Sequence, residues 1–490
     1  MVKNFTKSIN VRITDFCIAT ILLFVMIGGA IVIMHRPSWT MDDDTIIQCK
    51  TGMGKIMKLN ERPVFVPEEG RFFPMAYQHN NIVLLFDNSN RVPAKKVYAL
   101  NATVWCLFIL MLFFICVVSI NGTSNKKLKY WISALILLVI TQRTFQMFTV
   151  LWATSFWSYF IIVFILFVSY LYLRYKTISY LVLLSLGVLY LSLCGEMYVS
   201  VPFVIGAISF LSIGGSEKDS KIGFIMTIIV ILFFSAYMYF ILPHIKYAYD
   251  GSHGSNLSVF QNIIHIFYSQ KLLFVVLLTF IYRLYSVFVL NRYFDRYSDT
   301  FLCVAIGLLI SNFILKLNWP IYYVSVILFA LPSMLQLINL NNNNYSLLSL
   351  VCILFISGFY LIKFPKLINN ILQERERNYV DFNRFDAYCM ATDSIVWLQD
   401  SSSITKQKDN YAYSHLCMHL SQVKSINHYR PIDYRDITTG DFLLIAPESI
   451  RDVKLVEICG LDSSAFQWKD SVMSLKIYKI KNENSIRVSN

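Results

Sequence analysis

Apolar runs of about 20 residues recur along the chain, and each is long enough to cross a bilayer as a helix. They lie near residues 14–34, 99–120, 130–149, 155–173, 178–194, 197–213, 222–242, 272–291, 299–317, 320–338 and 346–364. Of the 490 residues, 56% are hydrophobic and 15% charged, whereas a soluble chain has about a quarter of its residues charged. The sequence therefore predicts a polytopic α-helical membrane protein with about eleven transmembrane helices.

The net charge of +13 is carried by residues 1–364, because residues 365–490 hold as many acidic as basic residues. Much of the excess lies in short loops after alternate apolar runs. These basic residues are Lys126, Lys127, Lys129, Arg174, Lys176, Lys218, Lys221, Arg292 and Arg296. The positive-inside rule assigns these loops and the N-terminus to the cytoplasm. No soluble segment carries a basic stripe, so nucleic acid is not an expected partner.

This membrane topology, in which the chain crosses the bilayer at each apolar run, predicts the domain organisation. Residues 1–364 form the transmembrane domain, and residues 35–98 form its large first external loop. Residues 365–490 form a small extracytoplasmic α/β domain, with a charged helical stretch at 373–384 and strands at 442–446 and 474–480. An odd number of spans places this domain on the same side of the membrane as the first loop.

Three adjacent carboxylates, Asp42, Asp43 and Asp44, form the densest polar signal of the first external loop. Carboxylates that repel one another can include one with a raised pKa, which suits a general base. They can also bind a divalent cation, which prefers oxygen ligands. A solvated turn or a helix cap accounts for the triplet equally simply. The triplet alone leaves these alternatives open.

A second polar element in this loop runs from Glu68 to Met75 with the sequence EEGRFFPM. Arg71 offers a planar fork for a phosphate or carboxylate, within an aromatic segment that Pro74 stiffens. The alternative is a loop that packs on the membrane surface, with Arg71 paired to Glu68 or Asp87.

Together, the acidic triplet and the Gly70–Pro74 element resemble the polytopic glycosyltransferases of the GT-C fold. The serotype-converting and surface-polysaccharide glucosyltransferases of bacteria are the nearest comparison. The resemblance implies transfer of a sugar from a polyprenyl-phosphate donor to an acceptor at the outer face of the membrane. It also implies that Asp43 or Asp44 is the base on the acceptor hydroxyl, with Asp42 in a structural role. Three acids stand where the family often has one or two, so the base is not assigned to one of them.

A leaving polyprenyl phosphate at the membrane interface calls for cations at the outer ends of spans. Arg143, Lys246 and Lys316 meet this condition, and Glu196 could orient the acceptor or one of these cations. The alternative for each cation is snorkelling of a long side chain to the interface. Arg283 lies nearer the cytoplasmic half of its span, so we expect it to pair with a backbone carbonyl or a lipid headgroup. Gly28 and Gly29 are expected to serve helix packing.

The sequence thus favours a glycosyltransferase of a bacterial cytoplasmic membrane, with a polyprenyl-phosphate-linked sugar, a glycan or lipid-linked acceptor and membrane lipids as partners. A cofactor is not specified beyond the divalent cation that Asp42–Asp44 could hold. A polysaccharide polymerase would place its large loop later among the spans. A flippase or transporter of lipid-linked saccharide would show repeat symmetry and polar residues near mid-bilayer. A membrane scaffold whose tail binds partners is the third alternative.

Overall fold

The computed structural model describes the apolar part of the chain and parts of the tail. It covers residues 16, 18–35, 65–66, 71–72, 95–121, 126–149, 154–211, 221, 224–225, 227–229, 231–232, 235–236, 239, 258–314, 317, 320–338, 358, 362–373 and 376. In the tail it covers residues 396–398, 429–431, 442–445, 466–472 and 475–480. The chain divides into two compact units, one of residues 1–33, 60–79 and 99–368, and one of residues 34–59, 80–98 and 369–490.

Most of the described part of the first unit is helical. Its elements are η1 Phe24–Gly28, α2 Gly29–Met34, α6 Lys95–Ser119, α7 Lys126–Phe148, α8 Thr154–Tyr175, α9 Ile178–Ser192, η3 Glu196–Ser200, α10 Phe203–Leu211, α12 Val259–Ser269, α13 Leu272–Phe288, α14 Ser298–Ile314 and α15 Pro320–Gln336. A two-stranded antiparallel ribbon pairs β1 Phe65–Val66 with β2 Arg71–Phe72.

Two of these helices are long and apolar enough to cross a membrane, at Lys96–Ser119 and Trp157–Tyr175. The pair α12–α13 meets the same test if it is counted as one broken span, and shorter apolar helices accompany them. The helices at Lys96–Ser119 and Trp157–Tyr175 and helix α13 coincide with apolar runs of the sequence, so the chain is a multi-pass membrane protein. The expected run at 346–364 and the total of eleven helices lie largely outside the described residues.

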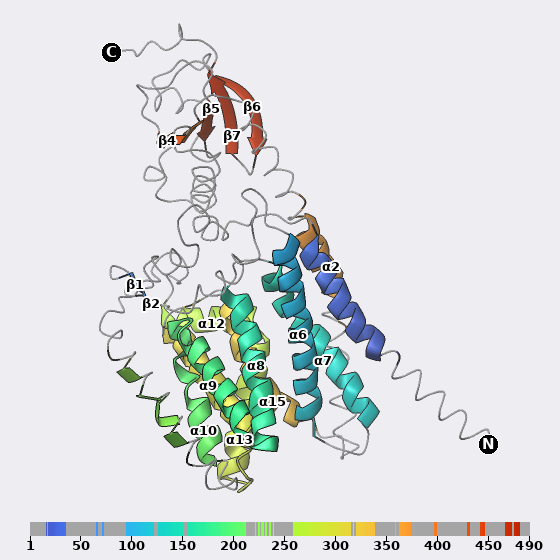
Figure 1. Cartoon of the computed structure of the whole chain (residues 1–490), viewed down its shortest axis with the longest axis vertical. Helices are drawn as coiled ribbons and strands as arrows, with labels where there is room; N and C mark the ends of the chain where they lie inside the picture. Colours follow the sequence, from blue (N-terminus) through green and yellow to red (C-terminus); the bar gives the residue numbers. More distant parts are fainter. Residues whose placement is uncertain are drawn as a thin grey trace, which may run out of the picture. The chain divides into compact units, whose positions relative to one another are not determined.

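Helices α14 and α15 form the most extensive contact in the bundle, and α15 also packs on α8 and α13. Their shared interface is aromatic: the rings of Phe301 and Phe329 stack with centroids 5.9 Å apart. Figure 1 shows α8 next to α9, with α6 and α7 on the other side of α8 and α2 beyond them. Burial of apolar side chains between helices, together with backbone hydrogen bonds inside each helix, lets such a bundle persist in lipid.

The first apolar run packs closely on α6 around Trp105. Trp105 is fully buried, and its indole Nε1 donates to the carbonyl oxygen of Val25 at 3.1 Å. Val25 lies in the π-helical turn η1, where the backbone is locally rewound. A Cβ atom added at Gly29 would overlap Trp105 Nε1, whereas one at Gly28 would meet nothing within 4 Å. The expected packing role is therefore confirmed for Gly29.

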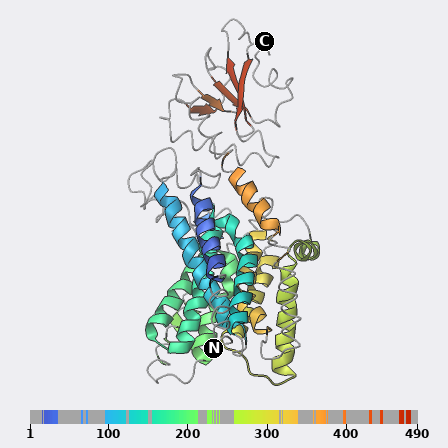
Figure 2. The same cartoon turned by 90° about the vertical axis from the view of Figure 1, so that its right-hand side faces the viewer.

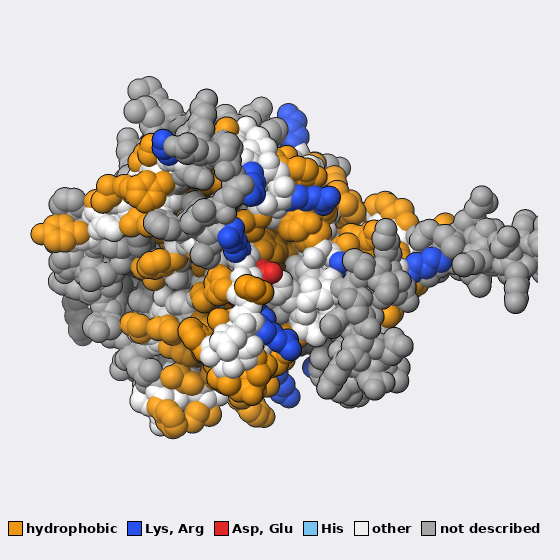
Figure 3. Space-filling model, turned by 90° about the horizontal axis from the view of Figure 1, so that it is seen from below, with side chains coloured by type: hydrophobic (Ala, Val, Ile, Leu, Met, Phe, Trp, Pro, Cys, Tyr) orange, Lys and Arg blue, Asp and Glu red, His pale blue; other side chains and the backbone are white. Residues whose placement is uncertain are grey.

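One end of the bundle gathers the basic links, and we call it the basic end. It carries Lys127, Lys129, Arg174, Lys176, Arg292 and Arg296. Figure 3 looks onto this end and shows Lys and Arg side chains distributed across it. The turn from α8 to α9 takes only Lys176 and Thr177, because Lys176 adopts a φ of 52° and its N–H bonds Tyr172 O at 2.7 Å. The basic links that the sequence assigns to one side therefore do share one end of the helices.

The described residues of the tail include a mixed five-stranded sheet in the order β4-β3-β5-β7-β6 (Figure 2). Its strands are β3 Val396–Leu398, β4 Tyr429–Pro431, β5 Phe442–Ile445, β6 Phe466–Val472 and β7 Leu475–Ile480. β3 is parallel to both β4 and β5, and β7 is antiparallel to β5 and β6. The strands expected at 442–446 and 474–480 are confirmed. The helical part of the expected α/β domain stays a prediction, since described helical residues here end at 376.

Candidate functional site

The end of the bundle opposite the basic end is where the sequence predicts the site, and we call it the opposite end. Asp42, Asp43, Asp44, Lys246 and Lys316 lie outside the described residues. The backbone of Arg71 forms strand β2 and pairs with Val66, but its side chain is likewise not described. Arg143 lies near the end of α7 and Glu196 at the start of η3, each one helix away from a basic link and therefore at the opposite end.

Arg143 is the predicted cation whose side chain the structure describes. It is half-buried on the last turns of α7, and its Nη1 donates to Oε1 of Gln270 at 3.2 Å. Gln270 is 5% exposed and ends α12, where the chain turns into α13. A neutral amide orients a guanidinium without cancelling its charge, so this contact can hold Arg143 toward an anionic group.

Gln270 escaped the sequence analysis because its partner is 127 residues away. The available signal is weak: Gln270 and Lys271 interrupt two apolar stretches. In the structure the chain bends by 106° at these two residues, between α12 and α13. The bend between α12 and α13 is thus also the place where Gln270 binds Arg143 of α7.

Glu196 begins the short 3-10 helix η3, which links α9 to α10 and packs on α14. Its side chain is not described, but its backbone is firmly placed by its neighbours. The hydroxyls of Tyr198 and Ser325 share a buried hydrogen bond of 3.3 Å, and Ser200 Oγ donates to Val304 O at 3.1 Å. A Cβ at Gly307 would come within 2.5 Å of Ser200 Cβ, so the close approach of η3 to α14 depends on this glycine.

Two buried amides at the opposite end are further residues that the sequence analysis missed. Asn262 of α12 is fully buried, and neither side-chain atom has a hydrogen-bond partner among the residues described. Asn312 of α14 donates to Tyr322 O at 3.3 Å, while its Oδ1 lacks such a partner in the same part of the chain. Buried amides normally have partners, so water or undescribed segments are expected to satisfy these atoms.

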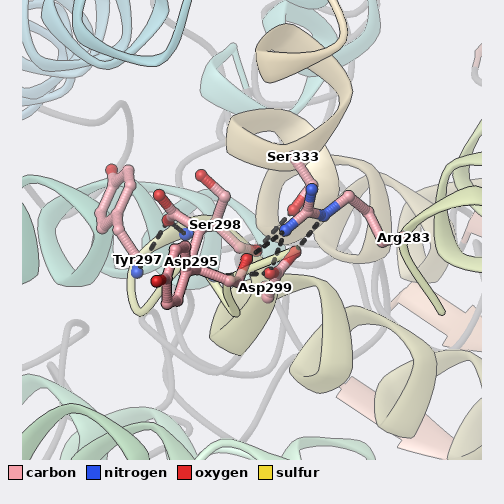
Figure 4. Close-up of polar contacts among 7 residues, drawn as sticks. Arg283, Asp295, Tyr297, Ser298, Asp299 and Ser333 are labelled. Atoms are coloured by element: carbon pink, nitrogen blue, oxygen red, sulfur yellow. Dashed lines mark hydrogen bonds and ion pairs between the residues drawn. The ribbon is translucent and has the colours of Figure 1, made fainter. Parts of the chain in front are cut away.

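Near the basic end, Arg283 and Asp299 form the most complete polar cluster that the structure describes (Figure 4). Arg283 Nε donates to Asp299 Oδ1 at 2.7 Å and Nη2 to Oδ2 at 2.5 Å, with the side chains 14% and 5% exposed. The backbone N–H of Asp295 also donates to Asp299 at 2.7 Å. The Asp295 carboxylate in turn accepts from the N–H groups of Tyr297 and Ser298 and caps α14.

The expected partner of Arg283 is therefore corrected. Its main partner is the carboxylate of Asp299, and the backbone carbonyl of Tyr293 is a weaker second partner at 3.4 Å. A headgroup is not needed because a buried arginine gains more from a bidentate carboxylate. Both oxygens of Asp299 are engaged, so this cluster fastens α13 to α14 rather than offering a base.

Among the described residues, no group of three or more His, Cys, Asp and Glu side chains could hold a metal ion. Asp42–Asp44 fall outside that search, so a divalent cation at the triplet stays a prediction.

No family model and no curated protein sequence matches the chain. Among solved structures, the chain is similar to ArnT from Cupriavidus metallidurans in the apo state, at 10% identity and a TM-score of 0.45, over 94% of this chain and 97% of ArnT. ArnT bound to undecaprenyl phosphate is similar at 9% identity and a TM-score of 0.47, over 95% and 97%.

Proposed function

We propose that the chain is an integral membrane glycosyltransferase of GT-C-like fold. It moves a sugar from a polyprenyl-phosphate donor to a cell-surface glycan or a lipid-linked acceptor, at the outer face of the cytoplasmic membrane. The observation that carries the proposal is Arg143: a half-buried cation at the opposite end of the bundle, oriented by a neutral amide. A cation near a helix end in an apolar bundle lies at the depth of an interfacial phosphate.

The proposed reaction joins the acceptor oxygen to the anomeric carbon as the bond from that carbon to the phosphate oxygen breaks. Asp43 or Asp44 takes the proton of the acceptor hydroxyl, and Asp42 supports them. The released polyprenyl phosphate keeps the bonding electrons, and Arg143, Arg71, Lys246 or Lys316 stabilises its charge. Glu196, at the start of η3, orients the acceptor or one of these cations. No step depends on a metal.

The proposal also includes the number of helices, the side of the membrane that each end of the bundle faces, and the α/β domain of the tail. About eleven helices, a cytoplasmic basic end and an extracytoplasmic α/β tail would place the acidic loop, Arg143 and Glu196 on one side of the membrane. The grouping of basic links at one end supports this arrangement through the positive-inside rule.

The variant pair Asp43→Asn and Asp44→Asn tests the base directly. With radiolabelled polyprenyl-phosphate sugar and a lipid-linked acceptor, we expect the double variant to lose about 10²-fold or more of the transfer rate, since a general base contributes at least that much. The matched control is Asp250→Asn, another acid of an expected external loop, which should keep the parental rate. Full transfer by a normally expressed double variant would remove the base assignment.

A further inference from the structure

Helices α12 and α13 are not collinear, so they do not form one straight span. The two helices differ in direction by 106° across Gln270 and Lys271. The start of α12 is closed by a capping box, in which Ser258 Oγ accepts from Gln261 N and the Gln261 side chain accepts from Ser258 N. In Figure 2 α13 runs upright while α12 is seen nearly end-on beside its upper end. Helix α12 is therefore a separately capped helix that crosses the end of α13 instead of extending it.

The side chains of α12 divide into three faces. Its inner face packs on the bundle through Ile266, which is fully buried, and through Phe267, whose ring centroid lies 4.8 Å from that of Phe274 and 6.0 Å from that of Phe313. Its second face is an exposed apolar stripe, with Phe260 71%, Ile264 55% and Tyr268 80% exposed. Its third face is an exposed polar stripe one position further round the helix, formed by Gln261, His265 and Ser269.

Helix α12 contacts α13 at a place where the surface of α13 is apolar and exposed. Phe274 contacts Phe267 yet remains 49% exposed, and Leu278 and Ile281 follow along α13 with 65% and 55% exposed. As a candidate membrane-spanning helix, α13 has hydrocarbon as the natural surroundings of these side chains. Through Phe267, α12 therefore abuts a lipid-facing surface of α13, while Phe260, Ile264 and Tyr268 are exposed on the same helix.

We propose that α12 is a membrane-surface helix whose partner is the lipid bilayer itself. Phe260, Ile264 and Tyr268 enter the boundary between headgroups and acyl chains, about 5–10 Å deep, while Gln261, His265 and Ser269 face water. The segment Val259–Ser269 contains no Lys, Arg, Asp or Glu, so apolar burial rather than attraction to anionic lipid holds it there. The proposal stands independently of the sugar chemistry.

Spin labels at six positions test the proposal in the full chain, in lipid nanodiscs, after replacement of its ten native cysteines. Labels at 260, 264 and 268 should collide readily with oxygen and rarely with a water-soluble nickel chelate. Labels at 261, 265 and 269 should show the reverse, and the pattern should not change between zwitterionic and anionic lipid. High nickel accessibility at all six positions would show that the helix is in water. Low accessibility to both reagents at 260, 264 and 268 would show a protein cover. Either result overturns the proposal.

Hydroxyl-radical footprinting of the unmodified chain in nanodiscs covers the case in which the cysteine-free chain does not fold. Tyr268 is 80% exposed on α12, and Tyr293, 96% exposed in the link from α13 to α14, is its matched control. Lipid should protect Tyr268, so we expect it to be oxidised several-fold more slowly than Tyr293. Equal oxidation of the two tyrosines would contradict the proposal.

Discussion

Arg143 and Arg283 both lie in apolar helices, and the partners that the structure describes for them differ in charge. Asp299 engages Arg283 at two atoms with a full negative charge, which suits a fastening between helices. Gln270 meets Arg143 with a neutral oxygen, and this contact fixes the guanidinium without neutralising it. The described contact of Arg283 is thus an ion pair between two helices, whereas that of Arg143 is a hydrogen bond to a neutral amide.

A double-mutant cycle tests the coupling of Arg143 to Gln270. A hydrogen bond to a charged group contributes about 1.5–3 kcal/mol, so Gln270→Leu should lower the transfer rate by on the order of tenfold or more. In the Arg143→Ala background the same change should have little further effect, because its partner is already gone. Transfer rates of the four chains provide the measurement. Fully additive effects would show that Gln270 does not act through Arg143.

Breaking the Arg283–Asp299 pair should instead lower stability. Arg283→Gln leaves the Asp299 carboxylate, 5% exposed, without its cation, which we expect to cost about 3 kcal/mol. Arg292→Gln, an exposed arginine of the same end, should change stability by less than about 0.5 kcal/mol. Thermal unfolding of the two variants in nanodiscs provides the comparison. Equal melting temperatures would mean that the pair does not fasten α13 to α14.

At the scale of elements, the contacts between helices concentrate at small residues and at aromatic rings. Trp105 fills the space that Gly29 leaves open, and α14 approaches η3 where Gly307 faces Ser200. Such close approaches supply the dispersion contacts that hold helices together in lipid, where the hydrophobic effect between them is absent. The position of η3, and with it the backbone of Glu196, follows from this packing.

The neighbouring glycines of the first span form a matched test of this packing. Gly29→Ala places a Cβ against Trp105 Nε1, and we expect the overlap to destabilise the protein by about 1–3 kcal/mol. Gly28→Ala meets open space and should leave the melting temperature unchanged or raise it slightly. A Gly29→Ala protein as stable as its Gly28→Ala counterpart would show that this contact is not a tight one.

Helix positions were predictable from apolar length, and their mutual contacts were not. The runs at 99–120 and 155–173 reappear as α6 and α8, since a bilayer-length apolar stretch has few alternatives to a helix. Helix α12 was missed because it is short and mixes apolar and polar residues within an expected loop. Arg143 was singled out by its place near a helix end, but its partner Gln270 depends on tertiary packing across 127 residues. The acidic triplet stays a sequence prediction.

At the scale of the whole molecule, the account depends on which side of the membrane each end faces. The basic end should be cytoplasmic and the opposite end, with α12, external. In the cysteine-replaced chain, an impermeant maleimide added to intact spheroplasts should label a cysteine at position 265 and not one at 292. Both positions are exposed, so access depends on the side of the membrane alone. Labelling of position 292 only would show that the basic end is external, and Arg143 would then lie at the cytoplasmic face.

The central claim is that the chain transfers a sugar from polyprenyl phosphate, and product analysis with the purified protein tests it most directly. With radiolabelled polyprenyl-phosphate sugar and lipid-linked oligosaccharide, we predict that one label joins each acceptor and that an equal amount of polyprenyl phosphate is released. Label that crosses the bilayer while still attached to its lipid would indicate a flippase. Joining of whole oligosaccharides without release of the monophosphate would indicate a polymerase. Either result would contradict the account.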